Sequence, residues 1–352
     1  MRLRRFILAL IAAAALAAGC AIEPPLHLRQ GLKVIVKVLW KAEVYPEGIK
    51  PSGVTLYFFR DGEYYMQYTT AQVDSCTVQL EPGKYRLYMI SQSPDEFAYM
   101  QFSNMTNFDL ASVTVEETKS SWYRTRAAEE VLAANPEHMI AGVSDEFEIE
   151  PDKVQSYQKS LAEAGGETED MVRYYTVRVP VYPKSIVSQF WVTIYSDNAD
   201  VLRSVRASTS GMARTFNLTQ GTTGDDECTQ LITDWRLTID DPVSRMGHLD
   251  GKITTFGFPR GEFPGPDRDP TLNVSTLLID YSTIETYSFY VGDKITLSDP
   301  PPDGYRHLYR LVFGTVYEPA IHPPDVRPAD ESSGFDATVD DWEKGEDVDV
   351  NM

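Results

Sequence analysis

Histidine and carboxylate side chains are the residues of this 352-residue chain that could do acid–base or metal chemistry. The sequence has no His-Glu-x-x-His, no Gly-x-Ser-x-Gly and no phosphate-cradling glycine loop. With 52 acidic residues, pairs such as Asp225–Asp226, or Asp267 and Asp269, are expected by chance. The five histidines are scattered, without companions at ligand spacing: His27, His138, His248, His307 and His322. We therefore predict no enzyme activity, no catalytic residues, no metal site and no cofactor.

Three oxygen-bearing side chains lie close together in the sequence. Asp197, Asn198 and Asp200 could offer ligands to calcium. They lack the twelve-residue loop that supplies ligands at regular positions in an EF-hand. We expect a turn at this place.

The N-terminal segment indicates a different kind of chemistry. Three arginines within residues 2–5 precede an apolar run of thirteen residues, Phe6–Ala18. A helix needs about 20 apolar residues to cross a bilayer, so this run is too short to span one. A positive start, a short apolar core and small residues at its end are typical of a secretory signal peptide. We assign residues 1–19 to it.

A cysteine follows this segment directly. The sequence Ala17-Ala18-Gly19-Cys20 resembles the lipobox of bacterial lipoproteins, in which the peptide before the cysteine is removed and its thiol carries lipid. The usual pattern has Leu where this chain has Ala17. The alternative is an ordinary secreted protein cut near Ala18. We predict cleavage between Gly19 and Cys20, with acyl chains such as palmitate on Cys20 and a linker over residues 20–30. Each buried methylene would add about 0.8 kcal/mol to membrane binding.

The composition excludes some partners. The net charge is −20, and a protein that binds nucleic acid through its phosphates needs clustered Lys and Arg instead. The same charge disfavours binding to anionic lipid headgroups, so the acyl chains must hold the membrane. Outside the cytoplasm a disulfide between Cys76 and Cys228 is allowed, but two thiols are no disulfide framework. We expect both to stay free.

Alternation of apolar and polar residues dominates the rest of the chain, which indicates half-buried strands. Asp61-Gly62 lies between two such runs, as in a hairpin with a type I′ turn. Strands are predicted over Leu32–Trp40, Val54–Phe59, Glu63–Tyr68, Ser75–Leu80, Tyr85–Met89, Val113–Glu116, Glu146–Glu150, Val177–Val181, Phe190–Ile194, Thr229–Ile239, Lys252–Phe258, Leu272–Asp280, Glu285–Val291 and Lys294–Leu297.

Two stretches are predicted to be helical, and one of them ends at a predicted domain boundary. Trp122–Ala134 is rich in Ala and Glu and stops before a proline, and Asp152–Ala164 ends at two glycines. The polar run after those glycines separates an N-terminal domain, residues 31–166, from a C-terminal domain, residues 171–352. The predicted fold class is all-β: two tandem antiparallel β-sandwiches with one or two short helices.

The C-terminal segment is acidic but also contains large apolar residues. Residues 330–352 contain nine acidic residues, yet apolar side chains alternate there. The alternative is a solvated acidic tail. We predict a final strand that could pair with a partner chain, because disordered acidic tails rarely contain so many large apolar residues. Its apolar members are Phe335, Ala337, Val339, Trp342, Val348 and Val350.

Several short motifs carry a resemblance: Cys20, Trp40, Gly53–Tyr57, Asp61-Gly62, Leu80–Tyr85, Pro136–Met139 leading into Phe147–Ile149, Ser208–Ala213 and Phe335–Trp342. Together they resemble surface lipoproteins of Bacteroidetes, the FimB/Mfa-like fimbrillin class, and within it the uncharacterised members. The resemblance implies two transthyretin-like sandwiches, a lipid-anchored place on the outer-membrane surface, and work as an anchor or accessory component of fimbriae in cell adhesion. Partners would be fimbrial or other surface proteins, bound by strand pairing.

A second class of function stays open: a surface glycan-binding lipoprotein of a polysaccharide-uptake system. Exposed aromatic rings such as Tyr64, Tyr65 and Tyr68 could stack on sugars. On a regular strand, however, Tyr64 and Tyr68 share a face with Met66, which favours packing within the sheet.

Overall fold

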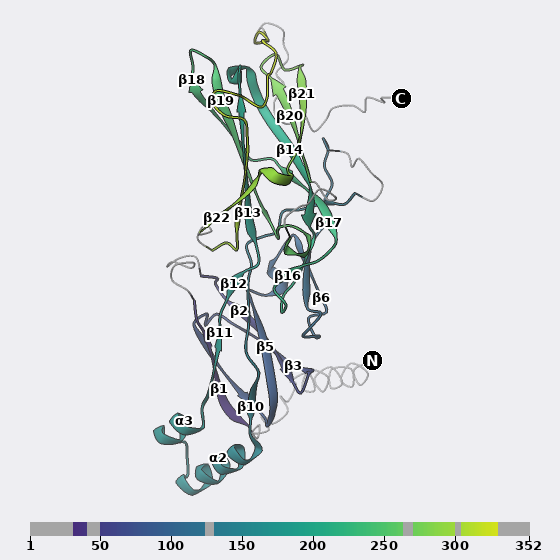
Figure 1. Ribbon diagram of the computed structural model, residues 1–352. Coiled ribbons are helices and arrows are strands. Elements are labelled where there is room, and N and C mark those ends of the chain that lie inside the picture. The colour runs from purple at the N-terminus through teal and green to yellow at the C-terminus, as the bar shows by residue number, and fades with distance from the viewer. Residues whose placement is uncertain (1–30, 41–49, 124–129, 263–269, 300–303, 330–352) are drawn as a thin grey trace, which may run out of the picture. The chain divides into compact units, whose positions relative to one another are not determined.

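The computed structural model describes residues 31–40, 50–123, 130–262, 270–299 and 304–329 (Figure 1). Strands form most of the regular structure of these residues, which confirms the all-β class predicted from the sequence. The chain divides into two compact units. The first contains Met1–Ile35, Thr77–Gly83 and Glu148–Arg178, and the second contains Val36–Cys76, Lys84–Phe147 and Val179–Met352. The division into domains 31–166 and 171–352 stays a prediction.

Two α-helices lie in the first unit. Helix α2 (Pro151–Ala164) starts with proline at its first turn and ends at Gly165, whose φ of 69° suits a left-handed cap. The helix predicted over Asp152–Ala164 is thereby confirmed. Helix α3 (Glu169–Tyr175) follows within the polar run and was not expected. Its N-cap is Thr168, whose side chain accepts a hydrogen bond from the Met171 backbone at 3.3 Å.

The hairpin predicted at Asp61-Gly62 is present. These two residues have φ of 52° and 88°, the positive values that a type I′ turn requires. The hairpin belongs to a sheet with strand order β12-β9-β5-β2-β3, and β10 pairs with β5. The bounds are β2 (Val54–Arg60), β3 (Glu63–Thr70), β5 (Gly83–Ser91), β9 (Ile140–Val143), β10 (Phe147–Ile149) and β12 (Lys184–Ser185). A three-stranded sheet has the order β11-β1-β4 and contains β1 (Leu32–Val38), β4 (Ser75–Leu80) and β11 (Val177–Val181).

Two five-stranded sheets of the second unit form a sandwich. In one, the side chains of Phe190, Val192 and Ile194 are buried while their neighbours are less so, the alternation of a strand with one face on the core. Phe289 of one sheet stacks on Phe313 of the other, with ring centroids 4.3 Å apart. The first sheet contains β18 (Trp235–Asp241), β19 (Met246–Thr255), β13 (Ser188–Ser196), β23 (Leu308–Phe313) and β22 (Ile295–Ser298), in this order. The second contains β21 (Ile284–Tyr290), β20 (Thr271–Leu278), β14 (Leu202–Ala213), β17 (Glu227–Ile232) and β8 (Leu132–Ala133), in this order.

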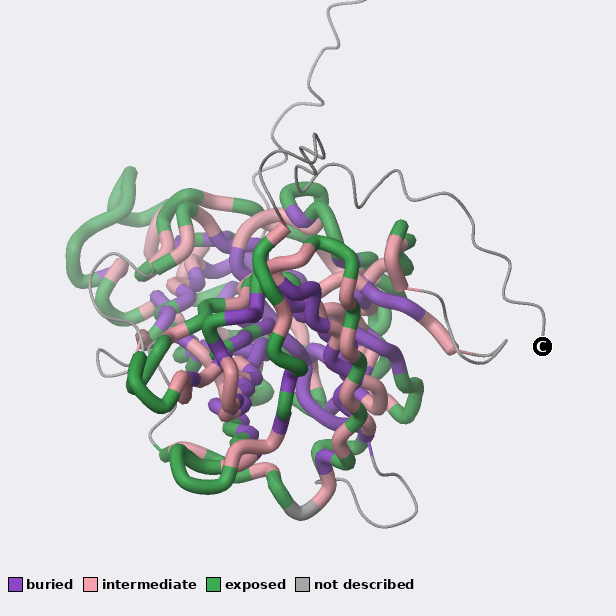
Figure 2. The backbone as a smooth tube through the Cα atoms, turned by 90° about the horizontal axis from the view of Figure 1, so that it is seen from above, coloured by how far each residue is buried: buried purple, intermediate pink, exposed green. Residues whose placement is uncertain are grey.

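A small sheet completes the second unit. Its order is β16 (Thr222–Thr223), β15 (Thr215–Asn217), β7 (Ser112–Val115) and β6 (Met100–Ser103). Its buried residues Val113, Val115 and Phe216 belong to the same apolar core as those of the sandwich. Figure 2 shows buried stretches on the inside and exposed stretches around them. Four 3₁₀ turns occur as well: η1 (Pro94–Glu96), η2 (Ala199–Val201), η3 (Pro259–Gly261) and η4 (Gly292–Lys294).

The helix predicted over Trp122–Ala134 is wrong in the part that the structure describes. Leu132 and Ala133 form strand β8, which pairs in parallel with β17, and both are buried. On the other side, Ala134 N donates to Glu116 O at 2.9 Å. Pairing with two distant segments outweighs the helix propensity of an Ala- and Glu-rich run, which amounts to tenths of a kcal/mol per residue. Residues 124–129 lie outside the described residues.

The strand predicted over Thr229–Ile239 is in fact two strands in different sheets. Strand β17 ends at Ile232 and β18 begins at Trp235, whose indole Nε1 donates to Ile232 O at 2.9 Å. Strands β14 and β23 were not predicted at all. Strand β14 lacks a clean alternation and contains a bulge near Gly211, which has a φ of 71°. Strand β23 pairs in parallel with β13, a partner more than a hundred residues earlier.

Cys76 and Cys228 are both free and buried, as expected. Burial raises the pKa of Cys76 to about 11 and that of Cys228 to about 12, so both thiols stay protonated. Among the described residues, no helix has the length and apolar character needed to span a membrane.

Candidate ligand-binding cleft and sheet edges

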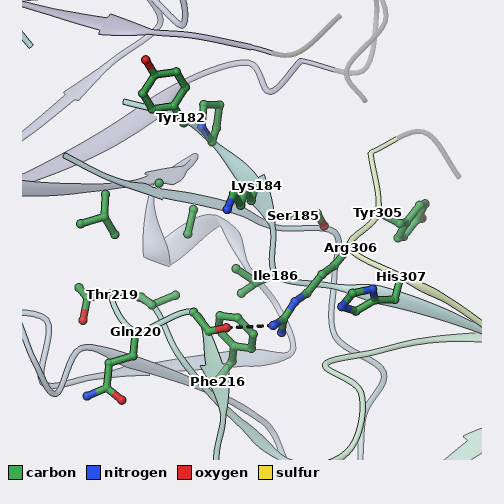
Figure 3. A pocket seen from close by; sticks show the side chains of 16 residues that line it. Tyr182, Lys184, Ser185, Ile186, Phe216, Thr219, Gln220, Tyr305, Arg306 and His307 are labelled. Carbon is green, nitrogen blue, oxygen red and sulfur yellow. Dashed lines mark hydrogen bonds between the residues drawn. The ribbon is translucent and has the colours of Figure 1, made fainter. Parts of the chain in front are cut away.

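A cleft of about 730 Å³ opens in the second unit where four short segments meet (Figure 3). It is lined by 141–143 of β9, by 182–186 around β12, by the connection that follows Phe216 of β15, and by 305–307 just before β23. These segments are far apart in sequence. The sheets bring them together, so the backbone pairing determines where each side chain points.

Backbone hydrogen bonds position the segment 305–307. Arg306 N donates to Val187 O at 2.8 Å, and Gln189 N donates to His307 O at 2.9 Å. These two bonds begin the parallel pairing of β13 with β23. The backbone that carries the Arg306 side chain is therefore held by the hydrogen bonds at the end of a sheet.

The connection on the opposite side is organised by one asparagine. The Asn217 side-chain oxygen accepts hydrogen bonds from the backbones of Thr219, at 3.1 Å, and Gln220, at 2.8 Å. Gly221 then takes a φ of 71°, which favours glycine, and its N–H donates to Asn217 O at 3.0 Å. This tight turn presents the Gly221 carbonyl to the cleft.

Arg306 joins the two sides. Its guanidinium lies over the Phe216 ring, 5.0 Å from the centroid, and its Nη2 donates to Gly221 O at 3.0 Å, as the dashed line in Figure 3 marks. Burial lowers the pKa of Arg306 from its ordinary value, yet an arginine stays charged in proteins. No Asp or Glu occurs among the described residues that line the cleft.

Two further titratable side chains line the cleft. Burial, and then the positive charge of Arg306, lower the pKa of His307, so its imidazole is neutral at neutral pH. Lys184 is exposed and adds a second positive charge. The cleft is therefore cationic in a chain whose net charge is −20.

The remaining wall is apolar and aromatic. Ile186, Leu218 and Phe216 are buried and close one side. Tyr182 is 54% exposed, and Tyr305 is half-buried with its ring against His138 at 5.1 Å. An apolar surface with a few polar groups and one oriented charge is the usual composition of a small-ligand site.

Open sheet edges are the second functional feature. Strands β3, β18 and β21 each end the strand order of a sheet among the described residues. Strand β18 is exposed over much of its length, including Leu237 at 36% and Ile239 at 37%. Such edges can pair with a strand from another chain.

The three tyrosines of β3 do not all lie on one face of the strand. A bulge at Tyr65 shifts the register, because Phe58 pairs with Met66 but Phe59 pairs with Tyr64. The expectation that Tyr64 shares a face with Met66 is therefore wrong, since the extra residue turns Tyr64 to the opposite face. Tyr68 remains on the face of Met66, as expected.

Ring contacts agree with this register. Tyr64 packs edge-on against Phe59 at 6.0 Å, and Tyr65 packs against Tyr85 at 5.6 Å. Both rings are thus engaged in sheet packing.

The acidic and histidine residues singled out in the sequence are used in separate local contacts. Asn198 has a φ of 41° and begins a 3₁₀ turn, which confirms the turn predicted there. Asp197 contacts His322 at 2.7 Å and Asp200 pairs with Arg245 at 2.7 Å, so these carboxylates point to different partners. His248 lies between Asp240 and Asp250, at 2.8 and 3.3 Å.

Asp225 and Asp226 also separate, because Asp225 pairs with Arg260 and Asp226 accepts a hydrogen bond from Thr215 at 2.6 Å. His138 contacts the Gly304 carbonyl. No group of three potential metal ligands gathers among the described residues.

Several residues singled out in the sequence lie outside the described residues. They are Gly19 and Cys20 of the predicted lipid site, His27, Asp267 and Asp269, and the members of the predicted partner strand, Phe335, Ala337, Val339, Trp342, Val348 and Val350. Sequence reasoning missed the cleft. Arg306 and Lys184 belong to no recognisable sequence motif. His307 was considered only as one of five scattered histidines.

Comparison with solved structures places the fold. A "putative adhesin" from Bacteroides ovatus is 12% identical, with 84% of this chain and 94% of that chain covered, at a TM-score of 0.52. The fimbrial anchor protein Mfa2 from Porphyromonas gingivalis is 12% identical, with 80% and 90% covered, at a TM-score of 0.43. "Putative polysaccharide binding proteins" from Bacteroides thetaiotaomicron are 10% identical, with 82% and 94% covered, at 0.47.

Of these three, only the first is similar enough to show a shared fold, and it confirms at that level the resemblance seen in the sequence. No curated protein matches the sequence. A family match covers residues 27–233, more than half of the chain. The chain belongs to the family described as "Domain of unknown function (DUF5119)".

Proposed function

We propose that this protein is a non-enzymatic surface lipoprotein of the outer membrane that serves as an anchor or accessory component of fimbriae or another adhesion structure. The observation that carries the proposal is the fold shared with the Bacteroides ovatus protein over 84% of the chain. The signal segment and Cys20 add the export route and the membrane attachment. In this proposal residues 20–30 link the lipid to two domains, 31–166 and 171–352.

Membrane attachment would depend on the lipid alone. A net charge of −20 disfavours binding to anionic headgroups, so in this proposal the acyl chains hold the protein on the membrane. Cleavage between Gly19 and Cys20 would leave Cys20 as the first residue and the carrier of the lipid.

Contacts with other surface proteins would use strand pairing. Strands β3, β18 and β21 offer unpaired edges among the described residues. Ala329, the last described residue, donates from its N–H to Ile279 O at 3.3 Å, just after β20. In this proposal the alternating segment that contains Phe335 and Trp342 pairs with its own sheet or is donated to a partner.

The test follows the lipid and the partner in cells of the native host. Radiolabelled palmitate should enter the wild-type protein and fail to enter Cys20→Ser. Cys76→Ser is the matched control, because it removes a buried thiol and should keep the label. External protease should degrade the protein on intact cells, and fimbrial subunits should co-purify with it.

Equal labelling of wild type and Cys20→Ser would contradict the lipid anchor. Protection from external protease would contradict the outward orientation. Co-purification of polysaccharide-uptake components in place of fimbrial subunits would favour a glycan-uptake role.

A further inference from the structure

The cleft around Arg306 combines a positive charge with partial burial. Water can only partly solvate the guanidinium, and no carboxylate lies among the described residues that line the cleft. A cation that is partly removed from water is stabilised when an anion is placed beside it. In a chain of net charge −20, a cationic cleft is a specific local arrangement and does not follow from the overall composition.

The guanidinium is also held in a defined orientation before any ligand binds. The Phe216 ring supports it from one side, and the Gly221 carbonyl accepts a hydrogen bond from Nη2 (Figure 3). An arginine has five N–H donors in a planar fork, and the contact with Gly221 uses one of them. The remaining donors match the two oxygens of a carboxylate, and Lys184 can add a second, more flexible charge.

The surroundings favour a sugar ring over a peptide. A peptide strand would need several consecutive backbone groups to pair with, but β12, the sheet-edge strand that lines the cleft, has only two residues. The exposed ring of Tyr182 and the half-buried ring of Tyr305, beside the polar side chains of Thr219 and Gln220, suit the apolar face and the hydroxyls of a pyranose.

We infer that this cleft binds an acidic sugar residue of a glycan, with its carboxylate on Arg306 and its ring against Tyr182 or Tyr305. The inference does not rest on the lipid or on strand pairing, so it can succeed or fail independently of the proposed function. It gives a surface protein of this fold a small-molecule site that is separate from the open edges at β3, β18 and β21.

The test measures binding to the full-length protein in detergent by ligand-observed NMR titration, with methyl glucuronide as the probe. Methyl glucoside and methyl glucuronamide have the same ring without the negative charge, and both should bind at least about tenfold more weakly. This comparison changes only the ligand, so it needs no variant that must fold. Binding of all three sugars with equal affinity, or of none, would overturn the inference.

Two arginine variants locate the site. Arg306→Gln should weaken methyl glucuronide binding at least about tenfold, whereas Arg306→Lys keeps the charge and should lose less. Arg310→Gln is the matched control, because Arg310 is exposed, lies over the Trp191 ring and does not line the cleft. Unchanged binding by Arg306→Gln, or tighter binding of an acidic peptide than of any acidic sugar, would contradict the assignment.

Discussion

The β2–β3 hairpin and the cleft around Arg306 are assembled in opposite ways. The hairpin joins neighbouring residues through the two-residue turn Asp61-Gly62, and its two strands pair with each other directly. The cleft joins segments between residues 141 and 307, and Arg306 and Gly221 meet there although 85 positions separate them. The hairpin contributes buried rings to the core, whereas the cleft exposes a charge and an aromatic surface. We therefore expect mutations in the hairpin to affect stability and mutations in the cleft to affect binding.

The largest difference between the two regions should come from removing a core ring of the hairpin. Phe59 is 2% exposed and contacts Phe108 at 5.3 Å and Tyr88 at 5.8 Å. Phe59→Ala should lower the free energy of unfolding by about 3–5 kcal/mol, because it leaves a cavity. In the cleft, Arg306→Gln should cost about 1 kcal/mol or less. Urea denaturation of both variants checks this, and equal losses would erase the distinction between the regions.

Glycine substitutions should show where the two regions are alike. Gly62 in the hairpin and Gly221 at the cleft have φ of 88° and 71°, and a methyl group added at either position would meet no neighbouring atom within 4 Å. The cost of Gly62→Ala and Gly221→Ala is then the backbone strain alone, about 1 kcal/mol each. Thermal unfolding measures it. A loss at one position several times larger than at the other would show that more than local backbone conformation is involved.

A smaller effect is expected at the bulge of the hairpin. Tyr64 is 41% exposed and keeps one edge-on contact with Phe59. Tyr64→Ala should reduce the free energy of unfolding by about 0.5–1 kcal/mol. The matched variant is Phe59→Ala, which removes the other ring of the same pair. Losses of similar size for the two variants would place Tyr64 in the core and contradict its partly exposed position.

The smallest expected effect is the pH dependence of the cleft. The pKa of His307 is lowered in the fold, so the unfolded chain binds this proton more readily. The free energy of unfolding should therefore fall as the pH drops below about 6.5, the ordinary pKa of histidine, and continue to fall through the lower pKa of the folded state. His307→Gln should make the decline between pH 7 and 5 shallower. Identical pH profiles of wild type and His307→Gln would show that this histidine does not contribute.

Local patterns predicted much of the fold. The turn at Asp61-Gly62, the strand Ser75–Leu80 and the helix beginning near Pro151 depend on neighbouring residues, so their signals lie within a few positions of each other. The segment Trp122–Ala134 shows the opposite case. Its composition favours a helix, but Ala133 pairs with Gln230, almost a hundred residues later. A rule based on neighbouring residues cannot identify a pairing partner that far away in the sequence.

The candidate site was still less predictable. Arg306 belongs to no motif, and its environment depends on Phe216 and Gly221, which the sheets bring to it. The face of Tyr64 depends on a one-residue bulge, which alternation in the sequence cannot show.

The sequence by itself determined the all-β class, the acidic charge and the hairpin turn, because each follows from composition or from residues next to one another. The tertiary structure decided which strands pair, which way Tyr64 faces and where Arg306 lies. Those features depend on contacts between distant segments. Such contacts form only as the chain folds, and their summed free energy can then outweigh the local preferences of a segment.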